Sequence, residues 1–310
     1  MRSDRWLGYL LIALGVALAA NSLLGPLALG IIEYHLSDTL LNQGIGLDAF
    51  SLVIVTPLLV GSGMLILRGS ANAPLIAIAP ALYLPYMFLQ YIAGPEYLLY
   101  EGNNESFFPL HAALLTLGAV AGVKAWALIG DDKMPRLSRR GERVAGLGVL
   151  SIAAFIAFGM YLSNGLIDAL SDFRAWTAVG DLSRAEYRDN PHMYWTVVMM
   201  DLGILVPGAT ATGVALMRGG SAWAHKALYV VVGWLALVGP AVAAMGIAMV
   251  VNDDPSASIG KTVMFLFAAG VFVAFAVRLY WTALRISNRS RRPARGGFGQ
   301  LARARGHEHS

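Results

Sequence analysis

The chain has 310 residues, of which 57% are hydrophobic and 14% are charged, and its mean hydropathy is +0.60. A soluble domain carries a larger charged fraction and could not cover this much apolar surface, so the composition excludes a water-soluble globular protein. There is no cysteine, which excludes disulfides, thiolate catalysis and thiolate-bound metal. The formal net charge of +4 hides a strong segregation of charge along the chain.

Apolar stretches with few or no charges follow one another along the chain. Each has about 20 residues, enough to cross a hydrocarbon core of ~30 Å at 1.5 Å per residue. The first could instead be a signal peptide that starts with Arg2 and Arg5, but its apolar run continues past the small residues 17–19 that would form the cleavage site. We therefore predict an all-α polytopic membrane protein with eight transmembrane helices, at residues 6–25, 50–67, 73–93, 110–129, 144–165, 194–217, 227–251 and 262–284.

Charged residues alternate between the two ends of these segments. If the N-terminus is cytoplasmic, the outer connections contain few basic residues, namely Arg174, Arg184, Arg188 and Lys261. The inner connections and the tail contain the rest, whereas most acids fall on the outer side. Because basic residues are retained in the cytoplasm, this pattern predicts that both termini are cytoplasmic and that the protein lies in the plasma membrane.

Two stretches resemble each other at a constant offset of 150 residues. Residues 52–71 read LVIVTPLLVGSGMLILRGSA, and residues 202–221 read LGILVPGATATGVALMRGGS. Both have a proline in the outer half, Pro57 or Pro207, and both end in Arg-Gly. Similarity at a fixed separation indicates a duplicated architecture. Four helices per repeat make the repeats parallel, because an even number of crossings returns the chain to the same side.

This duplication predicts the organisation of the chain. We expect a first four-helix repeat at 1–130, a basic cytoplasmic loop at 131–143, a second four-helix repeat at 144–286 and a disordered basic tail at 287–310. In the outer connection of the first repeat, a helix from Leu29 would place Leu29, Ile32, Leu36 and Leu40 on one stripe. Glu33 would then lie on that apolar stripe, which makes it an informative carboxylate.

Candidate binding residues concentrate in the predicted outer half of the membrane. They are Glu33, His35, Asp48, Glu96, Glu105, His111 and Asp201. Imidazoles with carboxylates can ligate zinc, iron or copper, so His35, His111, Glu33 and Glu105 are candidate metal ligands. Their spacing matches no metal motif such as HExxH. A proton-linked His/Glu site and simple anchoring of the outer loops are therefore alternatives, and the sequence identifies no cofactor.

Asp201 is the acid that lies deepest in a predicted transmembrane segment. An ionised acid in hydrocarbon costs roughly 2.5 to 3.5 kcal/mol on insertion scales, so Asp201 should face the protein interior and have a partner. Thr196 and Tyr194 are the candidate donors on its own helix. Asp48 lies near the mouth of the matching segment in the first repeat, about one helical turn earlier in the alignment of the repeats.

Three functions are compatible with this sequence. The leading hypothesis is a transporter or permease for a cation, a proton-coupled solute or a small molecule, because an acidic entrance concentrates cations. The alternatives are a membrane enzyme with an outer His/carboxylate metal site, and a non-catalytic scaffold or sensor. The expected partners are the lipid bilayer and, through the arginine-rich tail, anionic lipid head groups. Nucleic acid is not expected, because the basic segment is short and attached to a membrane protein.

Overall fold

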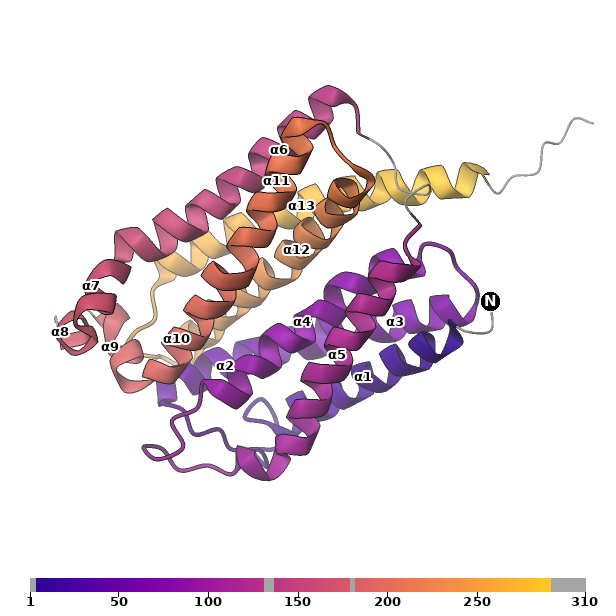
Figure 1. Cartoon of the computed structure of the whole chain (residues 1–310). Helices are drawn as coiled ribbons and strands as arrows, with labels where there is room; N and C mark the ends of the chain where they lie inside the picture. Colours follow the sequence, from indigo (N-terminus) through magenta and orange to yellow (C-terminus); the bar gives the residue numbers. More distant parts are fainter. Residues whose placement is uncertain (1–3, 131–136, 179–181, 291–310) are drawn as a thin grey trace, which may run out of the picture.

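The computed structural model describes residues 4–130, 137–178 and 182–290 (Figure 1). The fold is 83% helical, and no strand occurs among these residues. Eight helices are long and apolar enough to cross a membrane, which confirms the predicted fold class and number of spans. They run over Arg5–Leu24, Asp38–Leu67, Ala73–Ala93, Asn104–Leu128, Arg139–Asn164, Pro191–Arg218, Ala222–Val251 and Ile259–Thr282. The chain is therefore described below as an integral membrane protein.

The first half of the chain contains four of these long helices, arranged as two antiparallel pairs. Helix α1 packs along α3, and α4 packs along α5. The second long helix is continuous through α2, a π-helical segment η1 and α3. The bounds are α1 (Arg5–Leu24), α2 (Asp38–Phe50), η1 (Ser51–Val55), α3 (Thr56–Leu67), α4 (Ala73–Ala93), the short 3₁₀ helix η2 (Asn104–Phe107) and α5 (Phe108–Leu128).

The second half has the same pairing. Helix α6 packs along α11, and α12 packs along α13, while three short helices lie between the paired helices α6 and α11 in the chain. The bounds are α6 (Arg139–Ala154), η3 (Phe155–Tyr161), η4 (Leu162–Asn164), α7 (Leu166–Ser171), α8 (Phe173–Ala178), α9 (Leu182–Asp189), α10 (Pro191–Met200), η5 (Asp201–Leu205), α11 (Val206–Arg218), α12 (Ala222–Val251) and α13 (Ile259–Ser290).

The two halves lie side by side (Figure 1). They meet where α2 packs on α12 and where α4 packs on α10 and α12. At one of these crossings the backbone of Gly46 lies directly against that of Ala244, an approach that leaves no room for a side chain at Gly46. The start of α1 and the end of α13 lie at the same end of the bundle, and the connections 25–37 and 94–103 and the short helices α7, α8 and α9 lie at the other, which we call the connection end.

Three segments of the described residues are π-helical, η1, η3 and η5, and the positions of η1 and η5 differ by the same offset of 150 found in the sequence. In both η1 and η5, an N–H group bonds to the carbonyl five residues earlier, from Thr56 to Ser51 and from Val206 to Asp201. Pro57 and Pro207 follow directly. A proline has no N–H and its ring clashes with the carbonyl four residues before it, so the turn before each proline widens.

Close helix crossings also recur at matching positions. A Cβ atom on Gly63 of α3 would lie 2.6 Å from the carbonyl oxygen of Gly8 on α1. Gly213 of α11 is related to Gly63 by the same offset, and a Cβ atom on Gly213 would lie 3.0 Å from the carbonyl oxygen of Gly146 on α6. Small residues at such crossings let two helix backbones approach, which is how transmembrane helices gain packing energy where lipid offers no hydrophobic driving force.

The helix predicted from Leu29 is wrong, because the chain becomes helical only at Asp38. Instead, the N–H groups of Ile31 and Ile32 donate to the carbonyl of Leu24. The N–H of Glu33 donates to the side-chain oxygen of Asn103, and the N–H of Asn103 donates to the carbonyl of Glu33. These tertiary hydrogen bonds replace the local helical ones, so Glu33 does not lie on an apolar helical stripe.

The predicted tail also begins later than expected. Helix α13 extends to Ser290, so residues 287–290 are helical. The remaining tail residues, 291–310, and residues 131–136 of the basic loop lie outside the described part of the chain.

The glycine crossing predicts a sharp difference between two glycines of the same helix. Replacing Gly63 with Ala should destabilise the protein by about 1–3 kcal/mol, because the new methyl group meets backbone of α1. Gly61→Ala is the matched control, since a Cβ atom there meets nothing within 4 Å. The measurement is the thermal unfolding midpoint of both variants in detergent. Equal midpoints would show that the crossing is not tight.

Candidate functional site

The outer residues predicted to form a site are divided among separate contacts. His35 lies at the connection end, where its Nδ1 bonds to the carbonyl of Tyr100 at 2.6 Å and its Nε2 lies 2.8 Å from a carboxylate oxygen of Glu105. Burial of the ring lowers the pKa of His35, but its hydrogen bonds to the carbonyl of Tyr100 and the carboxylate of Glu105 outweigh this effect, so the pKa lies above its ordinary value. These contacts join His35 of the 25–37 connection to Tyr100 of the 94–103 connection and to Glu105 of η2.

Glu96 and His192 form a second contact, which joins the two halves. One carboxylate oxygen of Glu96 accepts a hydrogen bond from the backbone N–H of His192 at 2.8 Å, and the other lies 2.7 Å from its Nδ1. Nearby, the N–H of Ser37 donates to the side chain of Asn190, and the hydroxyl of Tyr100 donates to the carbonyl of Asp189. The connection end is therefore held closed by hydrogen bonds between the halves.

His111 and Glu33 take no part in these contacts. His111 is buried on α5, where its Nε2 lies 3.0 Å from the side-chain oxygen of Asn21 and its ring lies beside Tyr34 and Phe88. The side chain of Glu33 is exposed. Within the described residues, no three His, Asp or Glu side chains come together as a metal ion would require. The structure thus provides no ligand set for His35, His111, Glu33 and Glu105 as a metal centre.

Asp201 is held between hydroxyl groups from both halves. Tyr86 of α4 donates to one carboxylate oxygen at 3.1 Å, and Tyr161 of η3 donates to the other at 2.7 Å. These donors come from other helices rather than from Thr196 or Tyr194. Only 7% of Asp201 is exposed. Asp201 is the first residue of η5, and the widened π-helical turn places its carboxylate at the interface between the halves.

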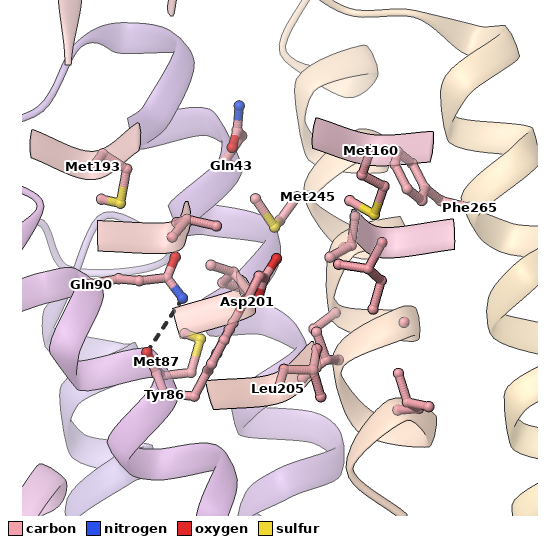
Figure 2. Close-up of a pocket in the computed structure, with 18 of the residues that line it drawn as sticks. Gln43, Tyr86, Met87, Gln90, Met160, Met193, Asp201, Leu205, Met245 and Phe265 are labelled. Atoms are coloured by element: carbon pink, nitrogen blue, oxygen red, sulfur yellow. Dashed lines mark hydrogen bonds between the residues drawn. The ribbon is translucent and has the colours of Figure 1, made fainter. Parts of the chain in front are cut away.

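Asp201 lines a cavity of about 310 Å³ between the two halves (Figure 2). The walls come from α2 and α4 of the first half and from α6, η3, α10, η5, α12 and α13 of the second. Figure 2 shows Tyr86, Met87 and Gln90 on the same side of the cavity as Asp201, and Gln90 donates to the carbonyl of Tyr86. The volume is at the lower end of the range for small-molecule sites, about 300–1,000 Å³.

The chemistry of this cavity is apolar, aromatic and singly charged. Asp201 is the only charged side chain among the described residues that line it, and Gln43 and Gln90 are the amides. The other walls are mainly aliphatic, methionine and aromatic side chains. The aromatic and methionine members are Tyr83, Tyr86, Tyr91, Phe155, Tyr161, Tyr187, Tyr194, Trp234, Phe265, Phe272, Met87, Met160, Met193 and Met245.

The cavity has a flank where the two halves of the chain differ. In the first half α1 packs along α5, but within the described residues α6 has no comparable packing along the equivalent helix α13. Phe155 and Met160 of η3 line the cavity on this flank and are 54% and 36% exposed, respectively. Since α6 and α13 belong to helices long and apolar enough to span a membrane, lipid can contact these exposed side chains.

Asp48, like Asp201, is a buried acid within a membrane-spanning helix, and it does not line the cavity. It is 1% exposed and lies between α1, α2 and α4. The hydroxyls of Ser22 and Tyr91 approach the same carboxylate oxygen, at 3.3 Å and 3.4 Å. Tyr91 also lines the cavity, so the same residue contacts Asp48 and the space beside Asp201.

Sequence reasoning found Asp201 but missed the tyrosines around it. Tyr83, Tyr86 and Gln90 are spaced so that they share one face of α4. Polar groups on one face of a transmembrane helix indicate that this face points into the protein. Tyr161 carried no such signal, because it enters the site only through the position of η3.

No protein-family model matches this chain, and neither the curated proteins nor the solved structures include a match.

The raised pKa of His35 predicts a pH-dependent loosening of the connection end. Protonated His35 is stabilised in the folded protein, so this contribution is complete below the unfolded pKa of about 6.5 and is lost as pH rises through the higher folded pKa. Hydrogen exchange at the backbone N–H of Asn103 and Glu96 should accelerate as pH rises through that range, beyond the intrinsic rate of exchange. Glu105→Gln should weaken this dependence, because the hydrogen bond to the carbonyl of Tyr100 remains, while Glu101→Gln, at an exposed acid in the same connection, should leave it unchanged.

Proposed function

We propose that the protein is a membrane transporter that binds a small, mainly apolar monovalent cation in the cavity between its halves. The observation that supports this most is Asp201, which among the described lining residues is the single charged side chain of a cavity of about 310 Å³ lined with aromatic and methionine side chains. A carboxylate in such surroundings is costly unless a positive group meets it. The cavity offers one negative charge, so the complementary ligand has one positive charge.

The aromatic walls favour an organic cation over a hydrated metal ion. Tyrosine and tryptophan rings attract a desolvated cation through their faces, with about 2 kcal/mol or more available in dry sites. Apolar walls form favourable contacts with a ligand that has an apolar body. A hydrated inorganic ion would lose its water molecules on entry, and apolar walls would not replace those contacts. Tyr86 and Tyr161 already donate to Asp201, so the carboxylate is oriented before the ligand arrives.

Transport fits the surroundings of this cavity better than catalysis does. The cavity lies between two halves, and the hydrogen bonds Glu96–His192 and Ser37–Asn190 hold the halves together at the connection end. Breaking them would open the cavity on that side, which is the type of motion that alternating access needs. A metal-dependent enzyme finds no support in the described residues, because they contain no candidate metal cluster.

The orientation belongs to the same proposal. We infer parallel four-helix repeats at 1–130 and 144–286, with both termini cytoplasmic, in the plasma membrane. The support is the distribution of basic residues, the shared offset of η1 and η5, and the matched glycine crossings. The acidic connections, including Glu33, Glu96 and Glu105, would then concentrate cations at the outer mouth, and the arginine-rich tail would contact anionic lipid head groups.

The first test of this function is binding of tetraphenylphosphonium, a lipophilic cation, to the purified protein. Asp201→Asn should weaken binding by roughly 10- to 100-fold, because an interaction with a charged group contributes about 1.5–3 kcal/mol. Equilibrium dialysis with radiolabelled cation gives the dissociation constant. Proteoliposomes should take up the same cation faster than protein-free liposomes do, and Asp201→Asn should abolish this difference.

Two controls make that test specific. Glu101→Gln removes an exposed acid at the connection end and should bind the cation as the wild type does. Triphenylphosphine oxide, an uncharged molecule of related shape, should bind wild type and Asp201→Asn equally. If Asp201→Asn binds tetraphenylphosphonium as tightly as the wild type, Asp201 is not the counter-charge and the proposal fails.

The orientation can be tested because the chain has no cysteine of its own. Glu101→Cys, in the 94–103 connection, should react with a membrane-impermeant maleimide in intact cells. Arg218→Cys, at the opposite end of the bundle, should react only after the membrane is permeabilised. Both positions are exposed, so reactivity reports the side of the membrane. The reverse pattern would invert the topology.

A further inference from the structure

Asp48 lies in an oxygen-rich space inside the first half. Its Oδ1 atom is 3.3 Å from the hydroxyl oxygen of Ser22 and 3.4 Å from that of Tyr91. Among the described residues, its Oδ2 atom is fully buried and has no hydrogen-bond partner. Helices α1, α2 and α4 therefore each bring an oxygen atom to one point, yet the carboxylate is poorly satisfied by hydrogen bonds alone.

These separations are long for hydrogen bonds between hydroxyl and carboxylate oxygens, which are commonly about 2.7–2.8 Å. They fit oxygens that surround a cation. An ion that binds oxygens at about 2.4 Å, as ions of calcium's size do, holds neighbouring ligands at right angles about 3.4 Å apart. The spacing of Ser22, Asp48 and Tyr91 thus suits an oxygen-ligated ion better than a hydrogen-bonded acid.

A glycine lies beside Oδ2, where a side chain would crowd the carboxylate. A Cβ atom at Gly25 would lie 3.0 Å from Oδ2 of Asp48 and 3.3 Å from the carbonyl oxygen of Asn21. Gly25 follows the last residue of α1, so the negative end of that helix points to the same place. Backbone carbonyls at such helix ends are a common source of cation ligands within membrane proteins.

We propose that Asp48 is the centre of a sodium-ion site, with ligands from its carboxylate and the hydroxyls of Ser22 and Tyr91. Carboxylate, hydroxyl and carbonyl oxygens suit hard cations. Asp48 is the single acid at this position, so a monovalent ion neutralises it, whereas a divalent ion would leave a net positive charge in an apolar interior. Sodium has nearly the radius of calcium and fits the observed spacing, and potassium would need a wider one.

Tyr91 links this site to the cavity. Its hydroxyl faces Asp48, while the residue also lines the cavity that contains Asp201. An ion at Asp48 would fix this side chain and hence that part of the cavity wall. Sodium binding stands independently of the proposed function, but its use as a coupling ion for transport rests on it.

The experiment measures thermal unfolding of the purified full-length protein against NaCl, with choline chloride holding the ionic strength constant. The unfolding midpoint should rise with NaCl and saturate, because a ligand that binds the folded state stabilises it. The NaCl concentration at half effect should increase as pH falls, because protons compete for the carboxylate. Potassium chloride should be at least tenfold less effective.

Variants locate the ion. Asp48→Asn keeps the shape of the side chain and should abolish the sodium effect, and Ser22→Ala, which retains the carboxylate, should raise the half-effect concentration at least tenfold. Asp201→Asn should keep the sodium effect unchanged. Binding of radioactive ²²Na⁺ to the wild type and to both site variants provides a direct readout that does not depend on stability.

Several outcomes would overturn the sodium site. These are no sodium dependence in the folded wild type at any pH, equal effects of sodium and potassium, or a sodium effect that persists in Asp48→Asn. A dependence on pH alone would assign Asp48 to a proton instead. Failure here leaves tetraphenylphosphonium binding at Asp201 untouched, and failure of that binding leaves the sodium effect untouched, so the two proposals are tested separately.

Discussion

The two halves of this protein meet around one carboxylate. Asp201 accepts hydrogen bonds from Tyr86 of the first half and from Tyr161 of the second, and it is nearly inaccessible to solvent. In a low-dielectric interior such bonds are strong, and the carboxylate is costly without them. The position of α4 against η3 and η5 therefore affects both the stability of the bundle and the chemistry of the cavity, so structure and function share the same contacts.

The backbone makes this arrangement possible. A transmembrane helix must satisfy its hydrogen bonds internally, so a polar side chain can be re-aimed only by a local change of helical pitch. The π-helical turns η1 and η5, each followed by a proline, provide that change. At matching positions they place Ser51 beside Tyr83 and Asp201 beside Tyr86. Two tyrosines of α4 therefore form hydrogen bonds with equivalent positions of the two halves.

The halves are alike in helix pairing and glycine crossings but differ in chemistry. The first half buries Asp48 between three of its own helices, whereas the second half presents Asp201 at the interface. Helix α1 packs along α5, while α6 and α13 leave a flank of the cavity with partly exposed apolar side chains. A shared framework with different acids would let one half hold an ion and the other a solute, as we propose.

The sequence by itself determined the fold class and the eight spans, because segments of about 20 apolar residues have few alternatives to a membrane helix. It also singled out Asp201, since a charge within such a segment needs a partner. Only the tertiary structure decided what that partner is, because Tyr86 and Tyr161 come from other helices at distances that no local period encodes. For the same reason the sequence did not show how the polar residues of the connections are divided between contacts, with His35 on Glu105, Glu96 on His192 and His111 on Asn21. Loops without a helical or strand period are positioned by contacts such as Glu96 with His192, which only the packed halves bring together.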